Sequence, residues 1–417
     1  MFTRKLLIGI LLVLALVITG CTSPAFQTAA MPKPPDSVLE AFQTSIADRN
    51  NEFGFDLYAR LIDGEENILI SPASVAMALA MTYNGADAET QEAMARVLKI
   101  HDIDLDTLNR NNLALLYFLK TADPKVHLKI ANSLWMREGF EFDPDFLERN
   151  EEFYLAGLKA LDFSRDEAVD VINAWVEENT GGLIEDIIEP PIDPLTIMFL
   201  INAVYFQGTW TEQFSEEETR DMPFYPAAGG KASVPMMNRT GDYEYLETPD
   251  FQAIRLPYGE EERMAMYVFL PSQELGLEGF EKNLTFENWE SWLGDFNKIE
   301  GNIQLPRFTV EYEETLNGVL KALGMEVAFD PSNANFYNMV PGTPPQNIYI
   351  AEVKHKTFIE VDEVGTEAAA ATSVEMRLES MPLDFFHMTV DRPFFYAIHD
   401  RDTGAILFMG SVLDPDK

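Results

Sequence analysis

The chain has 417 residues and a formal net charge of −39. So acidic a chain is repelled by nucleic-acid phosphates and anionic lipid headgroups, which excludes nucleic acid as a partner and favours neutral or basic ones. Hydrophobic residues make up 47% of the chain, enough for a large core, and no Gly/Ser linker or internal repeat divides it. We therefore expect one large domain after the N-terminal segment.

The N-terminus has the pattern of an export signal. Arg4 and Lys5 precede an apolar run, 6–18, that is too short to span a membrane comfortably. The run ends in small residues and Cys21, the only cysteine, so no disulfide can form within the chain. This pattern resembles the lipobox of bacterial lipoproteins and predicts a signal peptide over 1–20 and lipidation of Cys21. The alternative is an ordinary secretory signal with an incidental cysteine.

Residues 21–36 contain several prolines and are predicted to form a flexible, extended tether. With a lipid on Cys21, the protein would be exported to the bacterial cell envelope and anchored to the membrane or the cell surface. The domain would then occupy residues 37–417.

The first part of the domain has helical spacing. One helix is predicted over 37–48 with Ser37 as its cap, and a second runs through Phe53 to Ile62. Between 67 and 98 we expect a short strand, a helix opening at Ser71-Pro72, a loop at Asn84-Gly85 and another helix. Proline suits the first position of a helix because it has no amide hydrogen to lose there.

The middle and later parts alternate between strands and helices. An amphipathic helix is predicted over 166–179, ended by Gly181-Gly182. The run 197–210 is continuously apolar, which is typical of a strand buried on both faces. Further strands are predicted at 129–136, 157–163, 253–257, 264–271 and 301–312, and a helix at 316–323 closed by Gly324.

The stretch 363–380, EVGTEAAAATSVEMRLES, is unusual. From Thr366 onward its even positions are small or apolar and its odd positions mostly polar, which suits a strand with one buried face. Four consecutive alanines, however, have poor strand propensity. The pattern favours a loop that becomes a strand only when triggered, although an alanine-rich helical turn or linker would fit the stretch alone.

The sequences on either side of 363–380 help to distinguish between these interpretations. IYIAEVKHKTFIEVDE precedes the stretch, and FHMTVDRPFFYAIHDRDTGAILFMGSVLDP follows it after a short loop. This assembly resembles the serpin family, in the hinge 365–372 and in the closing signature 391–394, and the resemblance extends over nearly all the chain from about Asn51 onward. The hinge consists of Gly365, Thr366, Glu367, Ala368, Ala369, Ala370, Ala371 and Thr372.

The resemblance implies an α+β serpin fold with a large, mainly antiparallel central sheet, smaller sheets and about eight or nine helices. It also implies an exposed reactive loop over about 364–386 and inhibition of a serine, or alternatively cysteine, protease by a monomeric, metastable protein. The protease would be trapped as an acyl-enzyme when the cleaved loop inserts into the central sheet. The helix at 166–179 would have to move aside.

Seven positions match places where the serpin sheet opens. Arg307 would pair with Glu363 at the base of the loop as a surface pair of small energy. The residues are Ser71, Ser74, Asn202, Trp210, His355, Arg307 and Glu363. Five of them also have a structural interpretation: helix capping for the serines, an amide satisfied by backbone groups for Asn202, core packing for Trp210 and a structural imidazole for His355.

Counting from the hinge places the reactive bond at Glu379-Ser380, where the inward apolar series also stops. Counting back from Phe394 instead gives a position near Pro382. Glu379 implies a glutamate-preferring protease, and Arg377-Leu378 is the second choice, for a trypsin-like one.

Enzyme chemistry finds little support. None of the five histidines lies in an HExxH motif, and no GxSxG, P-loop or GxGxxG motif is present, so we expect no catalytic residues, no metal and no cofactor. The rival to an inhibitor is a non-inhibitory serpin acting as a surface binding or carrier protein. Bulky, charged or proline residues at inward hinge positions would favour that rival, and Thr366, Ala368, Ala370 and Thr372 are none of these.

Overall fold

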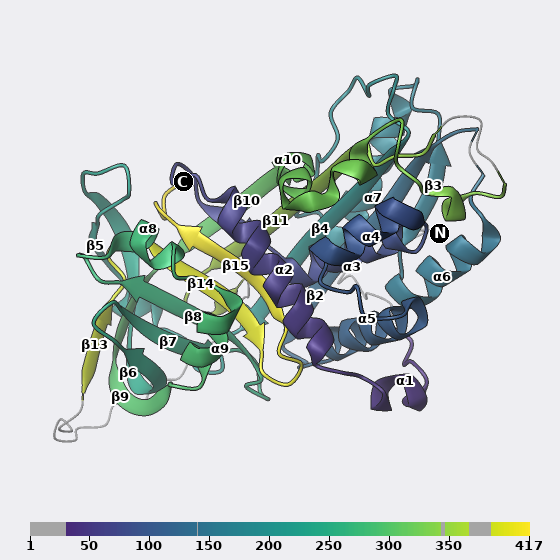
Figure 1. Cartoon of the computed structure of the whole chain (residues 1–417). Helices are drawn as coiled ribbons and strands as arrows, with labels where there is room; N and C mark the ends of the chain where they lie inside the picture. Colours follow the sequence, from purple (N-terminus) through teal and green to yellow (C-terminus); the bar gives the residue numbers. More distant parts are fainter. Residues whose placement is uncertain (1–30, 140, 343–346, 367–384) are drawn as a thin grey trace, which may run out of the picture. The chain divides into compact units, whose positions relative to one another are not determined.

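The fold of the protein is described from a computed structural model. The structure describes residues 31–139, 141–342, 347–366 and 385–417. The described residues from Lys33 onward belong to one unit. A six-stranded sheet has the order β10-β11-β12-β4-β2-β3 (Figure 1). Its strands are β2 (Val126–Arg137), β3 (Gly157–Leu161), β4 (Met198–Thr209), β10 (Phe308–Thr315), β11 (Glu352–Val361) and β12 (Gly365–Thr366).

A second, nine-stranded sheet has the order β1-β15-β14-β8-β7-β6-β9-β13, and β5 pairs with β6. Its strands are β1 (Ile68–Ile70), β5 (Arg220–Phe224), β6 (Ala232–Glu247), β7 (Phe251–Pro257), β8 (Met264–Pro271), β9 (Asn297–Pro306), β13 (Phe386–Thr389), β14 (Phe394–Asp400) and β15 (Ile406–Val412). Strands β8, β14 and β15 are buried along their whole length, so this sheet carries much of the core.

Ten α-helices occur among the described residues, slightly more than expected. They are α1 (Asp36–Glu40), α2 (Ser45–Leu61), α3 (Pro72–Tyr83), α4 (Ala88–Val97), α5 (Leu105–Lys120), α6 (Pro144–Tyr154), α7 (Glu167–Thr180), α8 (Gly276–Glu281), α9 (Phe286–Leu293) and α10 (Asn317–Leu320). Short helical turns are η1 (Glu216–Glu218), η2 (Lys321–Met325), η3 (Glu326–Phe329) and η4 (Tyr337–Met339). No helix among the described residues is long and apolar enough to cross a membrane.

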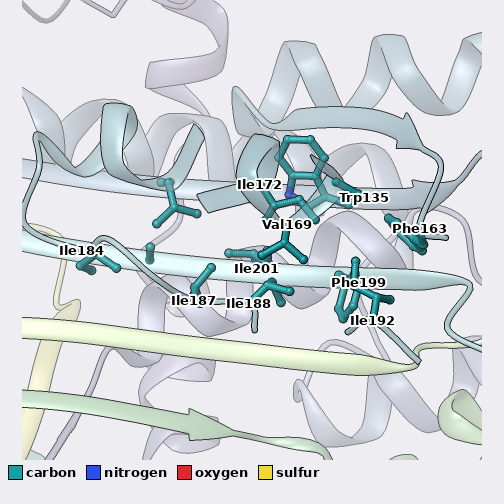
Figure 2. Close-up of a cluster of buried hydrophobic side chains, with 14 residues drawn as sticks. Trp135, Phe163, Val169, Ile172, Ile184, Ile187, Ile188, Ile192, Phe199 and Ile201 are labelled. Atoms are coloured by element: carbon teal, nitrogen blue, oxygen red, sulfur yellow. The ribbon is translucent and has the colours of Figure 1, made fainter. Parts of the chain in front are cut away.

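Two helices cover opposite faces of the six-stranded sheet. Every residue of α3 is buried, and the helix contacts β2 and β4 on one side and β15 of the other sheet on the other. A helix that is apolar all round must be buried on all sides. Helix α7 packs on the opposite face of β2 and β4, where its apolar side and the segment after it bury a cluster that includes Trp135, Ile172 and Ile201 (Figure 2).

Two sequence predictions are wrong in detail. The helix predicted over 37–48 is instead two, α1 and α2, because the backbone N–H of Gln43 donates to Asn111 Oδ1 on α5 and the chain turns there. The strand predicted over 301–312 is divided at Arg307 into β9 and β10, which belong to different sheets. Pro306 lacks an amide hydrogen to continue the first ladder.

Candidate functional site at the junction of β4 and β11

The first residues of the hinge already form a strand. β11 and β4 run parallel and pair directly from Glu352 opposite Phe199 to Phe358 opposite Tyr205. Beyond that point β12 lies between them, antiparallel to both, with Thr366 opposite Gly208 on one side and Val361 on the other. The two parallel strands are therefore parted at one end by the start of the loop.

Thr366 is fully buried, and its hydroxyl oxygen lies 2.8 Å from the hydroxyl oxygen of Tyr258. Gly365 approaches β4 so closely that a Cβ there would lie 2.0 Å from the carbonyl oxygen of Gly208. Only a residue without a side chain fits this contact. The side chain of Thr366 consequently points into the core between the sheets, as its inward assignment in the sequence requires.

Trp210 supports the turn that leads into β12. Its indole stacks on the ring of Tyr258 with centroids 4.3 Å apart and an interplanar angle of 12°. The indole Nε1 donates to the carbonyl oxygen of Asp362 at 2.9 Å, and its backbone N–H donates to the carbonyl oxygen of Val364 at 2.9 Å. The side chain thus joins the end of β4 to the base of the loop, which is more than core packing.

Arg307 and Glu363 form the contact that the sequence predicts. Arg307 Nε and one terminal nitrogen donate to Glu363 Oε1 at 2.9 and 2.7 Å, and the Thr219 hydroxyl donates to the same oxygen. The expectation of a surface pair is wrong for one partner, because the Glu363 side chain is only 4% exposed while that of Arg307 is 43% exposed. Burial raises the pKa of Glu363, but the hydrogen bonds from Arg307 and Thr219 outweigh it, and the pKa lies below its ordinary value.

A row of polar side chains crosses β11, β4 and β2 farther along the junction. His355 lies opposite Asn202, which lies opposite Asn132, and all three are buried. His355 Nδ1 is 2.6 Å from Asn202 Oδ1, and Asn202 Nδ2 donates to Asn132 Oδ1 at 2.6 Å. We call these three residues the polar row.

Two serines join the polar row to α3. The backbone N–H of Ser71 donates to His355 Nε2 at 3.2 Å, and Asn202 Nδ2 also donates to the hydroxyl of Ser74. Because Nε2 accepts, Nδ1 must carry the proton and donate to Asn202. Burial lowers the pKa of His355 to about 3, so the imidazole is neutral at physiological pH. Ser71 makes no side-chain cap at the start of α3, so the capping interpretation does not hold for it.

The sequence did not indicate Tyr258, Thr219 or Asn132, although they complete these contacts. Asn132 gives no distinct signal, because its strand also carries the polar residues His127, Lys129 and Ser133. Thr219 and Tyr258 lie in connecting segments and are brought to the site only by long-range folding. The remaining predicted residues lie outside the described chain: Glu367 to Thr372, the bonds at Arg377-Leu378 and Glu379-Ser380, and Cys21.

The geometry is that of a strand junction held by hydrogen bonds. Among the described residues, no group of three or more His, Cys, Asp or Glu side chains is arranged to hold a metal. His355 is enclosed by Asn202 and the Ser71 amide, so both of its nitrogens are engaged. This arrangement can hold a strand between β11 and β4, and its hydrogen bonds determine whether a longer strand can enter there.

Comparison with known proteins gives one family. Residues 48–415 match the family model described as serpin (serine protease inhibitor). The chain is 38% identical over 388 residues to an uncharacterized serpin-like protein of Thermococcus kodakarensis, covering 91% of this chain and 88% of that protein. The thermophilic serpin tengpin in its native state superimposes with a TM-score of 0.83 at 34% identity, covering 89% of this chain and 94% of tengpin. Human thyroxine-binding globulin complexed with thyroxine gives 0.81 at 26% identity, covering 91% and 99%.

Proposed function

Because the chain belongs to the serpin family, whose members are generally protease inhibitors and not enzymes, we propose that it is a suicide-type inhibitor that inserts its cleaved loop between β11 and β4. The observation that carries the proposal is β12. Gly365 and Thr366 already stand between the two strands as the first row of an inserted strand, with hydrogen-bonding partners on both sides. The rest of the loop would extend that row.

The proposed reaction begins as ordinary proteolysis. The protease serine attacks the carbonyl carbon of the residue before the scissile bond, the amine of the following residue leaves, and an ester joins protease to inhibitor. The freed hinge side then inserts and carries its end about 50 Å, from about fifteen residues at about 3.3 Å each. Distortion of the protease active site stalls hydrolysis of the ester, since catalysis depends on sub-ångström placement.

The register of β12 specifies the predicted destination of each following residue. The partners of β12 on β4 are Gly365 with Thr209 and Thr366 with Gly208, so each step forward along the loop is one step back along β4. Continued over six residues, this places Thr372 opposite Asn202. The pairing of Thr366 with Val361 on β11, continued in the same way, places Thr372 opposite His355. In the proposed inserted state, the Thr372 hydroxyl would therefore reach the polar row, where the incoming strand would separate His355 from Asn202.

Trapping is tested by incubating the protein with a panel of serine and cysteine proteases, including glutamate-preferring and trypsin-like ones, and looking for SDS-stable complexes. Thr366→Arg would bury an unpaired guanidinium beside Tyr258 and should leave cleavage intact while abolishing the complex. Thr309→Arg, at an exposed threonine of β10, is the matched control and should still trap. A Thr366→Arg variant with full trapping would mean that insertion is not the mechanism.

The same reactions identify the scissile bond. Mass spectrometry of the peptide released with the stable complex should show cleavage after Glu379, with Arg377 as the second choice. A cut outside 377–381 would show that the register counted from the hinge is wrong.

A carrier function is the second candidate, because the fold is shared with thyroxine-binding globulin in complex with thyroxine. The inward hinge residues speak against it, since small side chains at every inward position serve insertion and have no use in a carrier. Failure of every protease in the panel to form a stable complex, with the loop cleaved each time, would favour the carrier.

For location, we propose that Cys21 is lipidated and holds the inhibitor at the membrane through the tether. The support is the basic, apolar and small-residue pattern before the single cysteine. Cys21→Ser should release the protein from the membrane fraction or block its processing. Unchanged membrane fractionation of that variant would contradict the anchor.

A further inference from the structure

Asp123 ties the two sheets together near Thr366. The residue lies between α5 and β2 and is only 6% exposed. Its carboxylate accepts backbone N–H groups from Lys125 at 2.7 Å, Glu260 at 2.7 Å and Glu261 at 2.8 Å. Glu260 and Glu261 belong to the turn between β7 and β8, so one buried carboxylate joins the start of β2 to a turn of the other sheet.

Gly259 allows this close approach. Its φ is +74°, and a Cβ there would lie 2.3 Å from the Asp123 carboxylate. Glycine adopts such a backbone conformation without steric cost and leaves the space free. The backbone of Gly259 is also bound to β4: its N–H donates to the Thr209 carbonyl oxygen at 2.8 Å, and its carbonyl oxygen accepts from the Thr211 hydroxyl at 2.9 Å.

The residue immediately before Gly259 is Tyr258, whose hydroxyl meets Thr366. Tyr258 is fully buried, and its ring packs on Trp210 and on Phe206. The turn that follows Tyr258 is therefore held by Asp123, through Glu260 and Glu261, and by the end of β4, through Gly259. The position of the Tyr258 hydroxyl follows from both attachments.

We propose that Asp123 is a positioning residue for strand insertion: by holding the β7–β8 turn it places the Tyr258 hydroxyl against Thr366 and keeps β12 seated. The proposal rests on the inhibitory function proposed above. With β12 seated, the ordering cost of the first pairs has been met before cleavage, and each further residue adds to an existing ladder. If β12 is not seated, insertion starts later, and a larger fraction of the ester is hydrolysed before the protease is trapped.

A first experiment needs no protease. Hydrogen exchange of the backbone amides in 362–366 is measured on uncleaved Asp123→Ala, Tyr258→Phe and the double variant. Each single variant should accelerate exchange about two- to tenfold, the effect of losing one hydrogen bond of ordinary net strength. The double variant should add little to Tyr258→Phe. Acceleration confined to 259–263 would overturn the proposal, because Asp123 would then only stabilise its own turn.

The matched control is Asp330→Ala. Asp330 also accepts backbone N–H groups, from Ser332 at 2.7 Å and Asn333 at 3.3 Å, but within its own turn. Exchange in 362–366 should be unchanged in this variant. Asp123→Asn, which retains one acceptor oxygen, should fall between Asp123→Ala and the unaltered protein.

A second experiment measures how many inhibitor molecules are consumed per protease trapped. This number should rise about two- to tenfold in Asp123→Ala, in line with the exchange result, and the rise should be absent when Tyr258 is already phenylalanine. An equal rise in the Tyr258→Phe background would overturn positioning through Tyr258. Failure of the inhibitory function itself is distinguishable, because then the unaltered protein traps nothing while the exchange result still stands.

Discussion

His355 and Asn202 share a hydrogen bond of 2.6 Å that joins β11 to β4 across the line along which the proposed strand enters. In this bond Nδ1 carries the proton, because Nε2 accepts from the Ser71 amide, and it is this second contact that requires a neutral imidazole. Protonation of Nε2 would break the hydrogen bond from the Ser71 amide and leave two N–H donors facing each other in a buried site, where an unpaired donor is costly. The junction of β4 and β11 therefore depends on the protonation state of one side chain.

The pH dependence of stability follows from the His355 pKa of about 3, compared with an ordinary value of 6.5. As pH falls below about 6.5 the unfolded chain binds a proton there that the folded chain refuses, so stability is present above this pH and is lost toward pH 3, by about 1.4 kcal/mol per pH unit. In His355→Gln this loss should be absent. Urea unfolding midpoints between pH 7 and pH 4 measure the difference in slope.

Other groups make the comparison of slopes necessary. Burial also lowers the pKa of His399, to about 4, whereas burial raises that of Glu281 to about 7, and the latter adds stability as pH falls. Both contributions remain in His355→Gln and cancel in the comparison. His127→Gln, at an exposed histidine of β2, is the control and should keep the original slope. Identical slopes for His355→Gln and the unaltered protein would contradict the assignment.

The pair of Arg307 and Glu363 should respond unequally to mutation. Arg307→Ala leaves a buried carboxylate without its cation and should cost about 2 kcal/mol, less than for a fully buried pair because Arg307 is partly solvated. Glu363→Gln removes the charge but keeps an acceptor for Thr219, and should cost about 1 kcal/mol. Adding Glu363→Gln to Arg307→Ala should recover part of the loss in urea unfolding. Equal costs with simple additivity would show that the pair has no coupling.

Thr372 tests the register of the inserted strand. Thr372→Val keeps the shape but removes the hydroxyl that is predicted to meet His355 and Asn202, and an unsatisfied buried group costs about 1–3 kcal/mol. The cleaved protein should melt at a lower temperature than cleaved unaltered protein, while the uncleaved proteins melt alike. Thr372→Ser, which keeps the hydroxyl, and Ser373→Ala, at the next and outward-facing position, are the controls. A loss that appears instead at Ser373 would place the register one residue away.

Cleavage should stabilise the protein. Nicking the loop between Val374 and Ser380 with a protease that is not trapped frees the hinge to insert, and burying its inward side chains contributes on the order of 10 kcal/mol. Ordering the loop opposes this gain by about 1–2 kcal/mol per residue, so completing a strained sheet must supply the remainder. With both contributions, the melting temperature should rise by about 10 °C or more. The nicked Thr366→Arg variant should show no rise, because its loop cannot enter. Equal or lower stability of the nicked unaltered protein would favour the carrier function.

Local signals in the sequence were enough for many elements. Ser71-Pro72 marks the start of α3, Gly181 closes α7 at φ +78°, and the apolar run before Trp210 is β4. The junction between elements was harder, because its contacts are long-range. Thr366 and Tyr258 are 108 residues apart, and Asp123 and Glu260 are 137 apart, so neither pair leaves a pattern within any short window. The hinge was recognisable only because its own alternation and its flanks are local.

The parted end of the parallel pair also decides how the sheet can open. β12 already separates Gly208 of β4 from Val361 of β11. The proposed insertion can therefore proceed from this end one residue pair at a time, and the whole of β4 need not separate from β11 at once. Each β11–β4 residue pair that separates is replaced by pairing on both sides of the incoming strand. The barrier to insertion is therefore set by the residue pair that is hardest to separate. The row at His355 and Asn202 adds a side-chain hydrogen bond to the backbone ladder between β11 and β4, so the proposed insertion should be slowest there, whatever the length of the strand.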